Sequence, residues 1–518
     1  MLFVPKFPEY ILSLLMRGVR FSGPYKVGTI DVEIPLDELR SPSPSPLDDD
    51  SKVKTILYRI FYPCDPETKN EYADWLPQPQ RAYLAGYCRL LNVKSNVASC
   101  LSYIPNPFSF IKIPARIDAP ILKANNLNNR WPVMIFSHGL GGTRNTYSFI
   151  AGSISSYGMI VITPEHRDGS APISFIRNLS PEAKGLKQTL SDDQSVDYIQ
   201  LPHVASSTVE EARNSQLKIR LWELGLVHDS LLKINDGIPI KNLSPSSFIL
   251  DSVKGMMDLE TPGKISFAGH SFGAATITQF VKSTFYASSV YQAPKDFEPL
   301  FKPDSTATIT KQIIESTPVI LLDVWCLPLK AETTRWLWNR PLPSYNNEKS
   351  PGGKVILAIE SASFYNWDEH LQTTKKLLSP SPSSSINLEA VRNDISTWKE
   401  PYFYYAENSA HISQSDFGLL YPSITNKFLG CEEPERLMML QVRAIVQFLR
   451  NQDIEISPLS SKDKEINKNN EGIESDDDTY ILGDKQQVRG WIRISTFLDK
   501  NYNIKVDDDG NDDGKAIT

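Results

Sequence analysis

One serine, Ser271, carries the clearest chemical signal in this chain. It stands in Gly-His-Ser-Phe-Gly, residues 269–273, after an apolar run that begins at Ile265 and before a run of small residues. A strand, a tight turn and a helix form the setting in which a G-x-S-x-G motif carries a nucleophile. The two glycines leave room for the turn, and the new helix directs unpaired N–H groups at the reacting centre. The sequence therefore predicts a nucleophilic serine.

A serine nucleophile needs a base, and proteins built around this turn place the base after the serine in the chain. Two histidines, His370 and His411, follow Ser271. His411 comes soon after a predicted strand at residues 402–405, whereas His370 lies at a predicted helix start, where a capping or surface role is the alternative. Position therefore favours His411 as the base.

The acid that orients the base is expected after the first strand that follows the serine. Asp323 directly follows the apolar run 319–322, and no convincing helix comes after it, which favours an acid of a catalytic triad over a helix cap. The oxyanion donors are expected at the backbone N–H of Phe272 and in the glycine-rich run 138–142, where Leu140 is the predicted donor.

Strands and helices alternate around these residues, which predicts a mainly parallel sheet with helices on both faces. Predicted strands cover residues 23–35, 53–63, 131–136, 159–163, 265–268, 319–322, 354–359 and 402–405, and predicted helices cover residues 75–103, 147–157, 209–236, 437–450 and 486–498. The charged run 165–168 follows one strand, and we expect it to form a buried structural ion-pair cluster. His138 precedes the serine, and a structural role is expected for it.

The 518 residues suit one large domain with extensions. We expect a catalytic domain over residues 1–455 with Ser-Pro-rich loops at 41–51 and 379–385. A polar linker at 456–480, a short helical segment at 481–505 and an acidic disordered tail at 506–518 are predicted to follow.

Composition excludes several classes of partner. The net charge of −7 argues against nucleic-acid binding and against attraction to anionic lipid. We expect no signal peptide, membrane span or lipidation motif, and no metal or other cofactor. The five cysteines are few and unpatterned, which favours reduced thiols and a cytoplasmic location.

Several segments together resemble the platelet-activating-factor acetylhydrolases of the plasma and intracellular type II kind, across roughly residues 20 to 450. The segments that carry the resemblance are 23–28, 136–141, 165–168, 236–242, 269–276, 322–325 and the stretch from His411 to Phe417. The resemblance implies an α/β-hydrolase fold with Ser271, Asp323 and His411 as the triad and Leu140 and Phe272 as oxyanion donors.

The resemblance also implies calcium-independent hydrolysis of the sn-2 ester of phospholipids with short or oxidised acyl chains. Two alternatives stay open: a general carboxylesterase or acyl-thioesterase, and a catalytically silent scaffold of the same fold. A weak, reversible contact with membranes is expected through apolar side chains of residues 75–103, although packing of that stripe on the sheet is an equal alternative.

Overall fold

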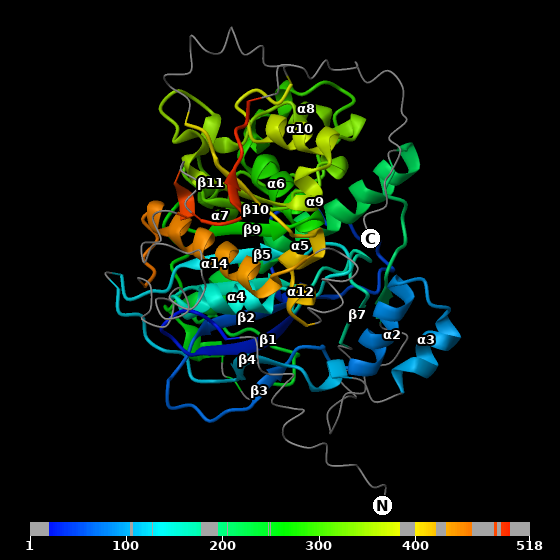
Figure 1. Ribbon diagram of the computed structural model, residues 1–518, viewed down its shortest axis with the longest axis vertical. Helices are drawn as coiled ribbons and strands as arrows, with labels where there is room; N and C mark the ends of the chain where they lie inside the picture. The colour runs from blue at the N-terminus through cyan, green and yellow to red at the C-terminus, as the bar shows by residue number, and fades with distance from the viewer. Residues whose placement is uncertain are drawn as a thin grey trace, which may run out of the picture.

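The computed structural model describes residues 20–103, 107–126, 128–177, 195–204, 206–246, 248, 250–383, 399–420, 431–457, 481–483 and 488–497. Its centre is an eleven-stranded sheet in the order β13-β12-β11-β10-β9-β5-β6-β2-β1-β4-β3 (Figure 1). From β6 to β12 all six strands run parallel, while β2 joins β6 and β1 joins β2 in antiparallel pairs.

The strands are short and buried near the middle of the sheet, where apolar residues face helices on both sides. Their bounds are β1 Val27–Pro35, β2 Thr55–Pro63, β3 Tyr72–Asp74, β4 Lys112–Ile117, β5 Val133–Ser137, β6 Ile160–Pro164, β9 Ser266–His270, β10 Val319–Leu322, β11 Ile356–Ser361, β12 Tyr402–Ala406 and β13 Trp491–Arg493. A separate hairpin pairs β7, Ile173–Phe175, with β8, Ser195–Asp197.

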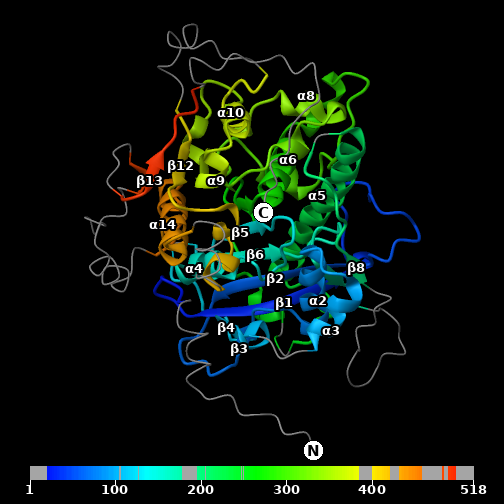
Figure 2. The same ribbon diagram turned by 45° about the vertical axis from the view of Figure 1, so that its right-hand side comes forward.

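Helices cover both faces, so that α4 and α14 lie on one side of the sheet and α5 and α6 on the other (Figure 2). The helices are α2 Gln80–Leu90, α3 Ser95–Ser102, α4 Ser148–Ser156, α5 Ser207–Asp236, α6 Phe272–Phe285, α7 Thr308–Gln312, α8 Arg335–Trp338, α9 Ala362–Tyr365, α10 Asp368–Leu377, α12 Asp416–Leu420 and α14 Pro434–Asn451. Within the described ranges, no helix has the length and apolar character needed to cross a membrane.

Helix α5 shows how the sequence sets its bounds. The side chain of Ser206 accepts a hydrogen bond from the backbone N–H of Val209 and caps the first turn. Gly237, at φ 71°, ends the helix in the left-handed conformation that glycine adopts without strain. The predicted helix over residues 209–236 is thereby confirmed.

The mainly parallel sheet predicted from the alternation and the α/β-hydrolase fold implied by the resemblance are both confirmed, and each predicted strand of the sheet is present. Two strands, β3 and β4, were not predicted. The edge strand β3 has three residues, and β4, between β3 and β1, contains Pro114, a residue that argues against a strand in sequence. The expected single helix over residues 75–103 consists of α2 and α3 instead, because Asn92, at φ 62°, breaks the chain between them.

The predicted helix over residues 486–498 is wrong in its described part. Residues Trp491–Arg493 form β13, which pairs antiparallel with β12 and places Trp491 against Ala406. The open edge of β12 offers unpaired backbone groups, and this segment satisfies them as a strand. The predicted linker lies outside the described residues from 458 to 480, and so does the acidic tail from 506.

Candidate active site

Ser271 occupies the sharp turn between β9 and α6. Its backbone lies at φ 55° and ψ −122°, a strained conformation for a residue with a side chain. The chain passes so close to itself here that a Cβ atom on Gly273 would overlap the carbonyl oxygen of Ser137, and one on Gly269 would meet the backbone of Gly273. Both glycines of the motif are therefore required by the turn that holds the serine.

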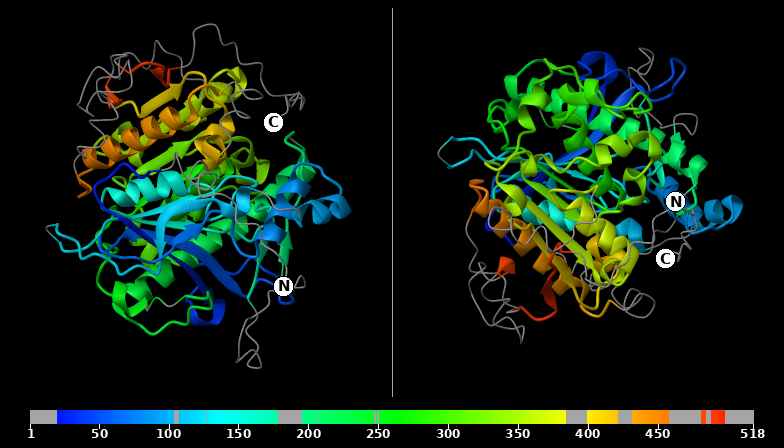
Figure 3. Two further views of the ribbon diagram at one scale, coloured as in Figure 1. Left: turned by 60° about the horizontal axis from the view of Figure 1, so that its bottom comes forward. Right: turned by 90° about the horizontal axis from the view of Figure 1, so that it is seen from above.

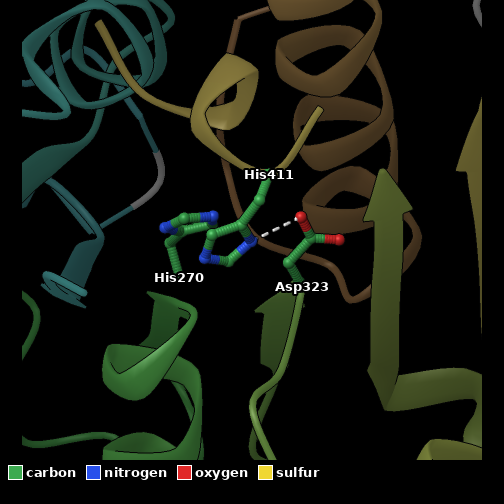
Figure 4. Close-up of side chains that lie close together, drawn as sticks. All are labelled: His270, Asp323 and His411. Atoms are coloured by element: carbon green, nitrogen blue, oxygen red, sulfur yellow. Dashed lines mark hydrogen bonds and ion pairs between the residues drawn. The ribbon is translucent and has the colours of Figure 1, made fainter. Parts of the chain in front are cut away.

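The structure brings together the three residues that the sequence predicts as a triad. Nε2 of His411 lies 2.9 Å from Oγ of Ser271, and Nδ1 of His411 lies 2.8 Å from Oδ2 of Asp323. Figure 4 shows the second contact, between the His411 ring and the carboxylate. Ser271, Asp323 and His411 follow β9, β10 and β12, so the carboxyl ends of parallel strands gather them at one edge of the sheet.

These contacts define one tautomer of His411. A carboxylate can only accept, so Nδ1–H donates to Asp323, and Nε2 is left to accept the hydroxyl proton of Ser271. This is the arrangement in which imidazole can act as a general base toward the serine.

His370, the other histidine after the serine, lies elsewhere. Its Nε2 accepts the backbone N–H of Cys326 at 3.2 Å, and burial lowers its pKa to about 3. It starts helix α10 as predicted, but it is buried rather than exposed. The geometry therefore selects His411 as the histidine beside Ser271.

Two contacts that sequence reasoning missed hold His411 and Asp323 in place. The ring of Phe364 stacks on the His411 ring, with centroids 4.4 Å apart and planes 10° apart. The backbone N–H of Ser361 donates to Oδ1 of Asp323 at 2.5 Å. Both residues lie where β11 runs into α9, and a polar residue at the end of a buried strand was the signal that could have found Ser361.

Glu360 is a buried acid next to this site. Burial, and then the charge of the neighbouring Asp323, raise the pKa of Glu360 well above its usual value. Both effects favour the neutral form of Glu360, which adds no second negative charge beside Asp323.

The predicted oxyanion loop lies against the elbow. A Cβ atom on Gly139 would approach the Cβ of Ser271 to 3.0 Å, which places the backbone of Gly139, the residue before Leu140, next to the serine. Tyr147 connects the two segments: its hydroxyl accepts the N–H of Gly139 at 3.2 Å and bonds Nδ1 of His270 at 2.7 Å. The other predicted donor, Phe272, begins helix α6, whose first N–H groups have no partner within the helix.

Arg220 and its partners fix this loop from behind. Arg220 donates to the carbonyl of His138 at 2.8 Å, to Asp168 at 2.7 Å and to the hydroxyl of Ser170 at 2.5 Å. The carbonyl of Ser170 in turn accepts the N–H of Gly141 at 2.8 Å. The residues on both sides of Leu140 are thus held by one buried cluster.

The predicted ion-pair cluster at residues 165–168 is confirmed. Three members have buried ion-pair partners, in the pairs Arg144–Glu165, Glu33–Arg167 and Arg220–Asp168. His166 instead shares a hydrogen bond with Glu223, and burial lowers the pKa of the histidine and raises that of Glu223 to about 8. His138 is structural as expected: Nδ1 bonds the carbonyl of Gly139, Nε2 accepts the N–H of His166, and burial lowers its pKa to about 4.

His270, Asp323 and His411 are the described residues that could approach a metal ion together, since their ligand atoms lie within 4.8 Å of one another (Figure 4). The rings of His270 and His411 are tilted, with centroids 4.4 Å and planes 30° apart. Both ring nitrogens of His411 already have partners, in Asp323 and Ser271, and Nδ1 of His270 bonds the hydroxyl of Tyr147. The group fits a hydrogen-bonded base better than a metal centre.

We therefore expect ester hydrolysis to be unaffected by excess chelator, because the serine, histidine and aspartate suffice for the chemistry. The rate is compared before and after dialysis against EDTA, and again after adding calcium or zinc. Activity that disappears in chelator and returns with one metal contradicts this expectation.

The chain is similar in sequence to several named proteins. A Schizosaccharomyces pombe protein named "Putative phospholipase A2" is 27% identical over 459 residues, which are 84% of this chain and 92% of that protein. Proteins named platelet-activating factor acetylhydrolase from Cavia porcellus and Canis lupus familiaris are each 30% identical, over 50% and 44% of this chain. The matches span about half of these two relatives, 50% and 46% of their length.

Among solved structures, a ferulic acid esterase from Streptomyces cinnamoneus aligns with a TM-score of 0.42 at 12% identity, over 85% of this chain and 95% of that chain. The sequence profile described as "Platelet-activating factor acetylhydrolase, isoform II" matches residues 15–479. This match extends over nearly the whole chain, and the chain belongs to the platelet-activating factor acetylhydrolase, isoform II, family.

Proposed function

We propose that this protein is a serine esterase that hydrolyses the sn-2 ester of phospholipids with short or oxidised acyl chains. The observation that carries the proposal is the continuous hydrogen-bonded series from Ser271 through His411 to Asp323 in a member of this family. The hydrogen-bonded series argues against a silent scaffold, which does not require one. The names of the relatives, platelet-activating factor acetylhydrolases, favour a phospholipid ester over the substrate of a general carboxylesterase.

The proposed reaction follows from the contacts of each group. Oγ of Ser271 attacks the sn-2 carbonyl carbon while Nε2 of His411 takes the hydroxyl proton, and Asp323 stabilises the resulting imidazolium. The backbone N–H groups of Leu140 and Phe272 stabilise the negative charge on the carbonyl oxygen. His411 then protonates the lysophospholipid alkoxide as it leaves, and water, activated by the same histidine, releases the acyl group.

Two measurements test the proposal. A fluorophosphonate probe should label Ser271, as expected of an activated serine, whereas absence of labelling would favour the silent scaffold. Hydrolysis rates across phosphatidylcholines with sn-2 chains of two to sixteen carbons should fall as the chain lengthens. Equal or faster cleavage of simple alkyl esters and thioesters, with no activity on the phosphatidylcholines, would favour the general esterase.

We further propose a weak, reversible contact with lipid surfaces through helices α2 and α3, which lie at the margin of the molecule (Figure 3). The stretch 75–103 divides into two parts. Trp75, Leu76 and Tyr83 are buried in the core, as the packing alternative expects. The exposed apolar side chains of the pair are Leu91, Val97, Leu101 and Tyr103, of which Leu91 is 76% exposed.

Sedimentation with vesicles tests this contact. Binding should be insensitive to salt and to the fraction of anionic lipid, because apolar insertion is not screened. Leu91→Asp together with Val97→Asp should lower the vesicle-bound fraction, while Ile238→Asp, at an exposed apolar side chain outside α2 and α3, serves as the control. Binding that requires anionic lipid and vanishes at high salt would show that charge provides the attachment.

A cytoplasmic location is part of the same proposal. All five cysteines are free thiols, and Cys64, Cys326 and Cys431 are buried. Reduced cysteines suit a reducing compartment.

A further inference from the structure

Arg213, in helix α5, lies beside the residues that adjoin the proposed triad. Its Cζ atom is 5.6 Å from the ring centroid of Phe272 and 5.2 Å from that of Trp325. The two rings meet edge to face, with centroids 6.0 Å apart, and the backbone N–H of Trp325 points to the carbonyl of Ser271 at 3.4 Å. Arg213, Phe272 and Trp325 therefore form a triangle next to the nucleophile.

Three N–H donors in this triangle have no hydrogen-bond partner among the residues that the structure describes. They are Nε and Nη2 of Arg213 and Nε1 of Trp325, while Nη1 of Arg213 donates to Gln216 at 2.7 Å. Arg213 is 1% exposed and Trp325 is 2% exposed, so bulk water does not satisfy these groups. Buried donors are nearly always paired in native proteins, and three unpaired donors in contacting side chains point to an acceptor that binds there.

The charge of Arg213 is also unbalanced. In the part of the chain that the structure describes, no carboxylate lies within ion-pair distance of it, and Asp168 pairs with Arg220 instead. A guanidinium stays protonated at physiological pH, and a buried charge without a counter-ion is costly. The two nearby rings offer only partial compensation through cation–π contact. An anion would supply both the missing charge and the missing acceptors.

We propose that Arg213 and the indole N–H of Trp325 bind the phosphate of the phospholipid substrate and so select phosphate-bearing esters. This inference rests on the proposed function, since it names a contact for the same reaction. A phosphodiester offers several acceptor oxygens, and a guanidinium can donate to two of them at once. His203, whose ring centroid lies 5.5 Å from that of Trp325, adds a further polar side chain at the same place.

A second anion could satisfy the same donors, namely the terminal carboxylate of an oxidised sn-2 chain. The phosphate is favoured because only a few bonds of the glycerol backbone separate it from the sn-2 ester, so its distance from the reacting carbonyl is nearly the same in every substrate. The carboxylate lies at a distance that changes with chain length, whereas the donors occupy one place beside Ser271.

Three esters that share an sn-1 alkyl ether test the assignment. The reference is an uncharged 1-alkyl-2-acetylglycerol, and the second ester is its sn-3 phosphocholine counterpart. The third is a phosphate-free 1-alkylglycerol whose sn-2 glutaroyl chain ends in a carboxylate. The quantity measured is kcat/KM for each, in the same mixed micelles, for wild type, Arg213→Gln and Arg213→Lys. Lys218→Gln, which removes one positive charge from the same helix, is the matched control.

Arg213→Gln should lower the phosphocholine-to-reference ratio of kcat/KM by on the order of 10- to 100-fold. Arg213→Lys should lower this ratio less, because lysine keeps the positive charge but loses the two-pronged hydrogen bonding of the guanidinium. Lys218→Gln should leave the ratio unchanged. Glycerophosphocholine should also inhibit hydrolysis of the reference ester more weakly in Arg213→Gln than in wild type.

An equal loss on all three esters, or an unchanged ratio, overturns the phosphate contact and leaves the proposed function standing. Loss confined to the glutaroyl ester overturns it in favour of the carboxylate. A wild-type protein that cleaves the uncharged acetyl ester but not its phosphocholine counterpart refutes the proposed function as well.

Discussion

Ser271→Ala should lower ester hydrolysis by on the order of 10⁴-fold or more, because it removes the atom that attacks the ester carbonyl. Oγ of Ser271 lies 2.9 Å from Nε2 of His411, so the hydroxyl and the base form one hydrogen-bonded unit. The fold should persist, since alanine can occupy the same elbow with its Cβ atom in place. Initial rates on 1-alkyl-2-acetylglycerophosphocholine, together with the melting temperature, measure both effects.

A matched control exists on the strand that leads into the elbow. The hydroxyl of Ser266, at the start of β9, is buried and has no hydrogen-bond partner among the described residues, so Ser266→Ala should change neither activity nor folding appreciably. If Ser271→Ala retained activity within tenfold of wild type while Ser266→Ala abolished it, the nucleophile would be misassigned.

Local patterns explain why the residues of the candidate site could be predicted to lie together. Ser271, Asp323 and His411 each follow a strand whose apolar run is visible in the sequence, and parallel strands bring their carboxyl ends to one edge. The charged run 165–168 likewise sits at the end of β6, where buried charges must find partners. In these cases a residue's position at the end of a predicted strand is enough to predict where it lies in the fold.

The features that were not predicted depend on long-range packing. Phe364 stacks on His411, and Arg213 meets Phe272 and Trp325, across separations of tens of residues that no local pattern encodes. The segment at Trp491 has a helical apolar spacing, yet it forms a strand because the free edge of β12 is available to it. Tertiary context decided these cases, and local periodicity could not supply it.

The second large effect concerns the groups that activate the serine. Asp323→Asn and His411→Ala should each lower kcat by on the order of 10⁴-fold. In Asp323→Asn the amide oxygen accepts the N–H of Ser361, so the NH₂ group turns toward Nδ1 of His411. Nδ1 must then accept, the ring proton moves to Nε2, and the histidine can no longer take the proton of Ser271.

Because the three residues act as one unit, combining either change with Ser271→Ala should cost little beyond the single change. His370→Ala is the control, and it should reduce activity far less, since Nε2 of His370 is occupied by the N–H of Cys326. The measurement is kcat for the four single variants, His370→Ala included, and the two double variants on one phospholipid ester. A damaging His370→Ala beside a mild His411→Ala would move the base to His370, and losses that multiply in the double variants would show that the residues act independently.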